Sequence, residues 1–178
     1  MQLYIVLVLS VLQGMNLVRV KPIDEISLKV PESFFSVPEE EMRYRNINFR
    51  RPIALYTDAN GDFDLTINQN PSRWRETDIE ILKDFYKSNI LSLYDDVVFT
   101  KEEVAEIRGR KYAVFEFIST TAGDESSFRN KGSVRKYTYI QYTVYNGTTL
   151  IFNFTSSARA KNQWSSVVPE IMESVALK

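Results

Sequence analysis

The stretch VRKYTYIQYTVYNGTTLIFNFTS, residues 134–156, decides the fold class of this chain. β-Branched and aromatic residues dominate both of its halves, which is typical of β-strands. Between the halves stands Asn146-Gly147, a dipeptide that tolerates the two positive φ angles of a type I′ turn. The stretch therefore predicts two antiparallel strands, Val134–Tyr145 and Thr148–Ser156, joined by a tight hairpin.

These strands are apolar on both faces, because successive side chains of a strand point to opposite sides of its sheet. The alternation divides one strand into two sets: Tyr137, Tyr139 and Tyr145 on one face, and Ile140, Tyr142 and Val144 on the other. In the earlier segment Lys111–Ser119 it divides the side chains likewise: Ala113, Phe115 and Phe117 against Tyr112, Val114 and Glu116. A sheet with two apolar faces must be covered on both sides. The tyrosines are interpreted as core residues, with an aromatic ligand-binding surface as the alternative.

Two other segments have helical spacing. In Thr77–Leu93 the apolar residues recur every three or four positions, and Thr77 with Glu80 predicts a capping box at the helix start. The expected buried stripe of that helix is Ile79, Leu82, Phe85, Tyr86, Ile90 and Leu93. Ser157–Leu177 predicts a closing helix that buries Trp164 and that Pro169 kinks or splits in two.

The N-terminal half supplies the remaining elements. Ile26–Val30 alternates as a half-buried strand does, and Glu39–Arg45 predicts a short helix with acidic residues at its start. Ile53–Ile67 predicts a second hairpin, with a type I′ turn at Asn60-Gly61. Hairpins imply antiparallel pairing, and each long helix must cover a sheet face. The fold class predicted is α+β, with one antiparallel β-sheet sandwiched by helices.

This order of elements resembles the PsbP-like fold group, which includes the DcrB-like periplasmic proteins and a nuclear Ran-binding protein. The residues that carry the resemblance are the strand 26–30, the hairpin 53–67, the helix 77–93, and an ending made of RKYAVFEF (110–117), Asn146-Gly147, LIFNF (150–154) and the Trp164 helix. The resemblance implies an antiparallel sheet between helices and a binding or assembly role, with partners that differ among members. It includes no catalytic signature, so no functional residue is transferred.

Composition narrows the function classes. Lys plus Arg is 22 and Asp plus Glu is 23, so the net charge of −1 does not favour nucleic-acid binding. The chain has no cysteine and no histidine, which removes thiolate metal sites and every Ser-His-Asp arrangement. No cofactor is expected.

Residues 1–18 differ from the rest of the chain. They contain no charged side chain, and LYIVLVLSVL at positions 3–12 has the length and apolarity of a signal-peptide core. We therefore expect a signal segment at 1–18 and a single PsbP-like domain at 24–178. The expected location is exported, periplasmic or associated with the cell envelope. A lipoprotein is not expected from the sequence as written, because no cysteine could carry the lipid. A buried first strand or helix is the alternative interpretation of the apolar run.

One short segment places oxygen side chains at alternate positions, as the start of a calcium-binding loop does. These residues are Asp58, Asn60, Asp62 and Asp64. The resemblance to an EF-hand fails at two positions, since Phe63 stands where glycine is needed and Gln69 where a bidentate glutamate is needed. Calcium is a hypothesis for this loop, and a solvated hairpin turn explains the same residues.

The polar connection Thr120–Ser133 is the candidate partner-binding loop, because loops longer than about 12 residues are uncommon without a function. Phe128, Arg129 and Lys131 would be its contact residues, since aromatic and arginine side chains dominate interface energies. A plain connecting loop is the alternative.

The sequence therefore predicts an exported, non-catalytic binding or assembly module with a protein partner, and it indicates no oligomeric state. Two alternatives stay open. One is an enzyme that uses carboxylate, tyrosine or lysine groups alone. The other is an intracellular protein-interaction adaptor whose apolar start is buried in the fold.

Overall fold

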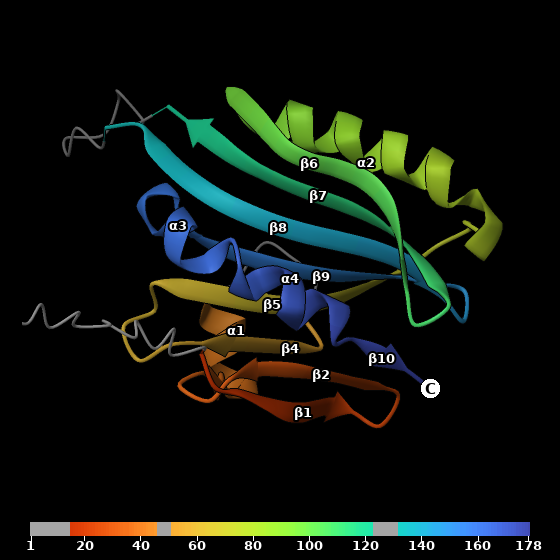
Figure 1. Cartoon of the computed structure of the whole chain (residues 1–178), viewed down its shortest axis with the longest axis horizontal. Helices are drawn as coiled ribbons and strands as arrows, with labels where there is room; N and C mark the ends of the chain where they lie inside the picture. The colour runs from red at the N-terminus through yellow and green to blue at the C-terminus, as the bar shows by residue number, and fades with distance from the viewer. Residues whose placement is uncertain (1–14, 46–50, 123–131) are drawn as a thin grey trace, which may run out of the picture.

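The computed structural model describes residues 15–45, 51–122 and 132–178, which form two antiparallel sheets with helices on both sides (Figure 1). In spatial order the larger sheet consists of β3 (Phe35–Ser36), β4 (Ala54–Thr57), β5 (Phe63–Pro71), β9 (Thr148–Ser157), β8 (Val134–Tyr145), β7 (Arg110–Thr121) and β6 (Asp96–Ile107). The smaller sheet consists of β1 (Leu17–Ile23), β2 (Ile26–Pro31) and β10 (Ala176–Leu177). The helical elements are α1 (Glu39–Arg45), η1 (Glu76–Asp78), α2 (Ile79–Leu93), η2 (Ala158–Ala160), α3 (Lys161–Trp164) and α4 (Val167–Glu173). The predicted α+β class is confirmed.

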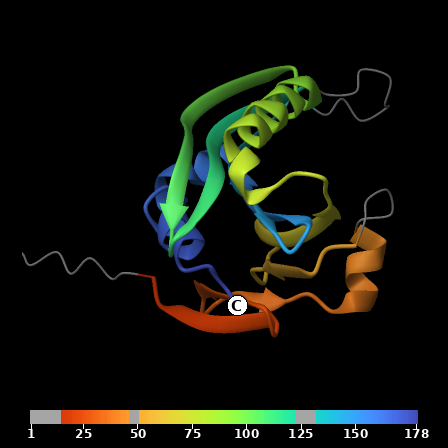
Figure 2. The same cartoon turned by 90° about the vertical axis from the view of Figure 1, so that its right-hand side faces the viewer.

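Each face of the larger sheet has its own apolar core. Figure 2 shows α2 on one side of β6 and β7, and α3 with α4 on the other. Phe115 and Phe117 pack under α2, whereas Tyr112, Tyr137 and Tyr139 pack on the side of α3, α4 and the smaller sheet. The face assignments read from strand alternation are therefore confirmed.

Of the two predicted type I′ hairpin turns, only one has the expected backbone angles. Asn146 and Gly147 have φ angles of 47° and 71°, and Tyr145 pairs with Thr148, so the β8–β9 turn has the type I′ sign pattern. At Asn60-Gly61 the prediction is wrong, because only Gly61, at φ 71°, has a positive angle. The longer connection there folds around Asp58, whose carboxylate accepts hydrogen bonds from backbone N–H groups.

The two predicted helices differ from expectation at their ends. The predicted capping box of Thr77 and Glu80 is wrong. The carboxylate of Asp78 instead accepts a hydrogen bond of 2.9 Å from the N–H of Arg75, and α2 starts at Ile79. The predicted stripe is also too wide, because Phe85 and Leu93 lie exposed.

The closing helix divides before Pro169 rather than at it. A proline ring clashes with the carbonyl four residues earlier, which here belongs to Ser165, so a helix through that point must kink or break, and here it breaks. The helix ends at Trp164, and α4 begins at Val167 with Pro169 in its first turn, where no N–H is needed. The chain then finishes as the strand β10 instead of continuing as a helix.

The N-terminal boundary lies in a strand. Leu17 and Val18 pair with Pro31 and Val30, so the end of the predicted segment 1–18 belongs to β1. Residues 1–14 lie outside the described residues. None of the helices in the described parts of the chain combines the length and apolarity needed to cross a membrane.

Candidate functional site

The predicted partner-binding residues Phe128, Arg129 and Lys131 lie outside the described residues. The described chain leads into that loop from β7, where the N–H of Ala122 donates a hydrogen bond of 2.6 Å to the carboxylate of Asp95. It returns at the start of β8, where Ser133 lines a cavity that is described below. The loop contact stays a prediction.

The predicted calcium residues belong to the β4–β5 connection. The Oδ1 atom of Asp58 accepts the N–H of Asp62 at 2.8 Å and that of Phe63 at 3.3 Å, so this carboxylate shapes the turn. Asp64 lies on β5, opposite Thr57. In the described parts of the chain, no three acidic side chains gather in a way that could hold a metal ion. Calcium binding by Asp58, Asn60, Asp62 and Asp64 stays a prediction, and the turn itself accounts for Asp58.

Three tyrosines of β8 are core residues, and Tyr145 is half-buried. Tyr137, Tyr139 and Tyr142 are buried, and the ring of Tyr142 stacks on Tyr86 at a centroid distance of 3.9 Å. Burial raises the pKa of all three phenols well above the ordinary value of 10.0. The hydroxyl of Tyr137 also donates a hydrogen bond of 3.0 Å to Glu116. These phenols stay protonated at physiological pH and cannot act as bases.

An acidic cavity of about 310 Å³ is the place where the enzyme alternative could apply. It lies beside β6 and α4, and its lining includes Glu103, Glu106, Glu173 and Tyr139. Burial and the charges of Glu103, Glu173 and Glu116 raise the pKa of Tyr139, which leaves carboxylates as the acid–base groups of the cavity. Lys101 and Arg108 also line it. Nothing in this lining provides an activated nucleophile.

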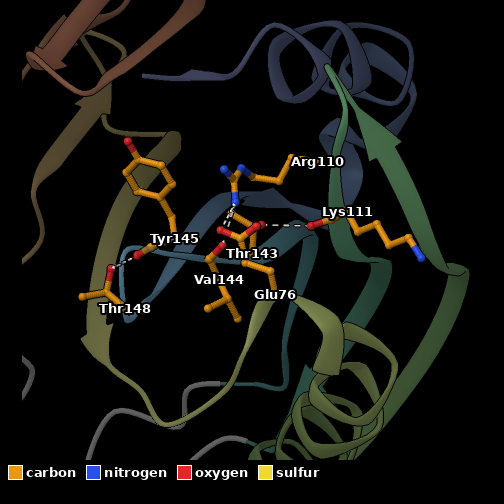
Figure 3. A network of polar contacts seen from close by, with 7 residues as sticks. All are labelled: Glu76, Arg110, Lys111, Thr143, Val144, Tyr145 and Thr148. Carbon is orange, nitrogen blue, oxygen red and sulfur yellow. Dashed lines mark hydrogen bonds and ion pairs between the residues drawn. The ribbon is translucent and has the colours of Figure 1, made fainter.

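A polar network where β7 begins and β8 ends has a structural role (Figure 3). The Nη1 group of Arg110 donates to Glu76 at 2.6 Å and to the carbonyl of Val144 at 3.0 Å, and its guanidinium lies 5.0 Å from the ring centroid of Tyr145. These contacts hold η1, and with it the start of α2, against the sheet. Because the guanidinium is engaged on both sides, this network is not a free binding site.

Four large apolar side chains of α2 are exposed. Ile81, Phe85, Leu91 and Leu93 expose 62%, 48%, 49% and 69% of their surfaces. Contiguous exposed apolar patches on soluble proteins mark interaction sites, and Ile81 and Phe85, four residues apart, lie on the same face of α2. We call these four residues the α2 surface. Sequence reasoning missed it, because the amphipathic pattern of α2 assigned Phe85 and Leu93 to the core.

The strand β6 is an edge of the larger sheet. Within the described residues it pairs only with β7, and the register shifts between Phe99 and Lys101, which marks a bulge. Bulges and charged side chains discourage pairing with another strand, and both occur in this strand. The carboxylates of Glu102 and Glu103 form ion pairs with Lys87 and Lys101. This edge is therefore protected, and the α2 surface beside it is the more open apolar feature.

A second cavity lies at the opposite end of the sheet from the Arg110 network. It measures about 530 Å³ and is lined by Ile118, Ser133, Arg135, Ser157, Ala158 and Arg159. An adjoining cavity of about 210 Å³ shares Arg135 and Ser157 with it and also includes Asp62 and Asp64. The structure thus brings the predicted calcium turn next to the described end of the predicted partner loop.

The fold defines the class to which this chain can be compared: it has the PsbP-like fold, an antiparallel sheet with helices on both faces. The solution structure of cyanobacterial PsbP (CyanoP) from Synechocystis sp. PCC 6803 is similar to it, with a TM-score of 0.63 and 15% identity over 94% of this chain and 95% of that chain. The Ran-binding protein Mog1p of Saccharomyces cerevisiae follows with a TM-score of 0.58 and 9% identity, over 92% and 96% of the two chains.

LpqN of Mycobacterium tuberculosis, described as involved in cell envelope biogenesis, is similar at a TM-score of 0.55 and 10% identity over 92% and 91% of the chains. No protein-family model matches this sequence, and no curated protein matches it. At these identities the likeness establishes the fold and leaves the function open. The resemblance expected from the sequence is confirmed at that level.

Proposed function

We propose that this protein is an exported, non-catalytic module that binds another protein through the α2 surface. The observation that carries the proposal is the exposure of four large apolar side chains on one helix of a well-packed domain. Burying them in an interface would remove apolar surface from water, which is the main favourable term in protein association. Structural neighbours that are named for Ran binding and for envelope biogenesis support a binding role.

The contact is tested with the double variant Ile81→Ser and Leu93→Ser. These are the most exposed side chains of the α2 surface, so the fold loses little apolar contact. Phe35→Ser is the matched control, because Phe35 is 46% exposed on the distant strand β3. We expect a partner identified with the wild-type protein to bind the control equally and the double variant at least about tenfold more weakly. Equal capture by all three proteins would overturn the contact surface.

The predicted loop residues form a second arm of the same experiment. Phe128→Ala with Arg129→Ala tests the loop that the sequence indicates, and Lys131→Ala can be added to it. If this variant loses the partner and the α2 variant keeps it, the contact belongs to the loop. Loss of partner binding in both variants would indicate that the α2 surface and the loop form one extended interface.

Export is tested with the N-terminal segment. A fusion to a reporter that is active only outside the cytoplasm should be active, and Leu7→Arg with Leu9→Arg should silence it, because charge disfavours membrane insertion. If the mature protein keeps all of β1, its N-terminus should lie at or before Leu17. An unchanged signal from the charged variant would favour the intracellular adaptor, and turnover that depends on Glu103 or Glu173 would favour the enzyme.

A further inference from the structure

The cavity of about 530 Å³ lies between the first residues of β8 and the η2 turn. Strand register explains how it forms. Arg135 pairs with Thr120 of β7, and Lys136 pairs with Ser157 at the end of β9. Arg135 therefore lies beside Ala158, where the chain leaves the sheet and turns into η2. The cavity combines residues from three strands and this turn, so no single segment of the sequence defines it.

The charge of its lining is entirely positive. Arg135 and Arg159 are the charged residues among those that line it, and no acidic residue of the described chain joins them there. Neither guanidinium forms an ion pair within the described residues, whereas Arg51, Arg110, Lys87 and Lys101 each pair with a glutamate. Two cations that lie together without carboxylates repel each other. An anion between them would remove that repulsion.

The neighbouring side chains add to this character. Ser133 and Ser157 carry hydroxyl groups that can donate hydrogen bonds, and Ile118 provides an apolar wall. Lys161 is the first residue of α3, and its Nζ atom lies 5.9 Å from the ring centroid of the buried Tyr137 of β8. Arg135 also lines the adjoining cavity, where Lys136 lies with Asp62 and Asp64, and neither aspartate forms an ion pair with Arg135 within the described residues.

We infer that this cavity binds the phosphate group of a phosphate monoester or diester. Guanidinium groups recognise phosphate through paired hydrogen bonds, and hydroxyl donors complete such sites. The volume is within the range of small-molecule sites, about 300–1,000 Å³, so it can hold an organic group together with the phosphate. Both arginines are exposed, so the affinity should fall as the salt concentration rises. This inference is independent of the proposed function, because no residue of the α2 surface lines the cavity.

The test uses the full chain labelled with nitrogen-15 and amide spectra recorded during titration with inorganic phosphate and then with glycerol 3-phosphate. We expect saturable shifts at the amides of Ser133, Ser157 and Ala158. Arg135→Gln with Arg159→Gln should weaken binding at least about tenfold, since each change removes charge-assisted hydrogen bonds. Shifts that do not saturate, or that spread over the surface without including these amides, would overturn the site.

The matched control removes the same charge elsewhere. Lys21→Gln with Arg73→Gln neutralises two exposed cations that lie outside the cavity lining. If the control weakens binding as much as the arginine pair does, the attraction is nonspecific and the site is refuted. Thermal unfolding of each variant shows whether the fold is retained, because binding is interpreted only for folded protein.

A vesicle sedimentation assay distinguishes a soluble phosphate ester from the phosphate ester of a lipid headgroup. Sedimentation is compared for vesicles of phosphatidylcholine alone and vesicles that also contain phosphatidylglycerol, with wild type, the arginine pair and the control. Binding of glycerol 3-phosphate with no vesicle binding indicates a soluble ligand. Phosphatidylglycerol-dependent sedimentation that the arginine pair loses and the control keeps indicates a lipid headgroup. Absence of both overturns the inference.

Discussion

Replacing Trp164 tests how the sheet holds its closing helices. The side chain is 2% exposed, although it belongs to a helix of only four residues. Its ring centroid lies 4.6 Å from that of Phe63, 5.0 Å from that of Phe154 and 5.6 Å from that of Phe34. These rings come from β5, β9 and the connection between β2 and β3, so one side chain joins the larger sheet and that connection to the closing helices.

The expected loss of stability on replacing Trp164 depends on its packing and on its one unpaired hydrogen-bond donor. Trp164→Ala removes a buried aromatic side chain, which costs about 3–5 kcal/mol. The indole N–H is buried without a hydrogen-bond partner in the described residues, and such a group destabilises a fold by about 1–3 kcal/mol. Because the alanine variant also removes this donor, we expect a loss near the lower end, about 3 kcal/mol.

Trp164→Phe is the control that separates the two contributions. It keeps one ring in the cluster of Phe34, Phe63 and Phe154 and removes the unpaired N–H. The smaller packing loss is then offset by the absent donor, so we expect a change of about 0–2 kcal/mol.

The assay is urea unfolding followed by circular dichroism. Fluorescence of Trp74, the remaining tryptophan, provides a second probe. A loss of 3 kcal/mol should lower the melting temperature by about 6–12 °C for a chain of this size. A loss below about 1 kcal/mol in the alanine variant would mean that the closing helices are peripheral to stability. Equal losses for alanine and phenylalanine would refute the packing explanation.

Three further outcomes follow from the structure. Gly147→Ala should destabilise by about 1 kcal/mol in thermal unfolding, because an alanine at φ 71° is strained, although nothing lies within 4 Å of the added carbon. Asp58→Ala should cost about 1 kcal/mol through the lost bonds to the N–H groups of Asp62 and Phe63, and calcium should raise the melting temperature of wild type alone if the loop binds it. Burial raises the pKa of Tyr112 to about 12. In the unfolded chain this phenol loses its proton at lower pH than in the folded protein. Its contribution to the free energy of unfolding is therefore fully present below about pH 10 and is lost between about pH 10 and 12. Tyrosine absorbance at 295 nm measures that titration, and ionisation of Tyr112 near pH 10 in folded protein would contradict its burial.

Local sequence determined much of the secondary structure. The side-chain alternation in β7 and β8 assigned Phe115 and Tyr112 to opposite faces, because a strand turns each residue by half a revolution whatever it packs against. Asn146-Gly147 determined its turn for the same kind of reason, since both residues accept a positive φ angle. Asn60-Gly61 did not determine its turn, because the carboxylate of Asp58 supplied competing local hydrogen bonds.

The candidate sites were less accessible to sequence reasoning. Phe85 and Leu93 fit a buried stripe by spacing, yet both are exposed: Phe85 lies against the rings of Trp74 and Tyr86, and Leu93 is the last residue of α2. The cavity of Arg135 and Arg159 had no local signature at all. Each arginine looks like an ordinary surface charge until strand register sets one beside the other.

By itself, the sequence determined the fold class, the antiparallel pairing, the strand faces and the absence of histidine and cysteine chemistry, because all of these depend on residue identity or on periods of two to four residues. Tertiary structure alone decided which apolar side chains stay exposed, which rings surround Trp164 and which cations share a cavity. Those outcomes depend on contacts between segments far apart in the chain, and such contacts form only when the strands pair into sheets and the helices pack on the two faces of the larger sheet.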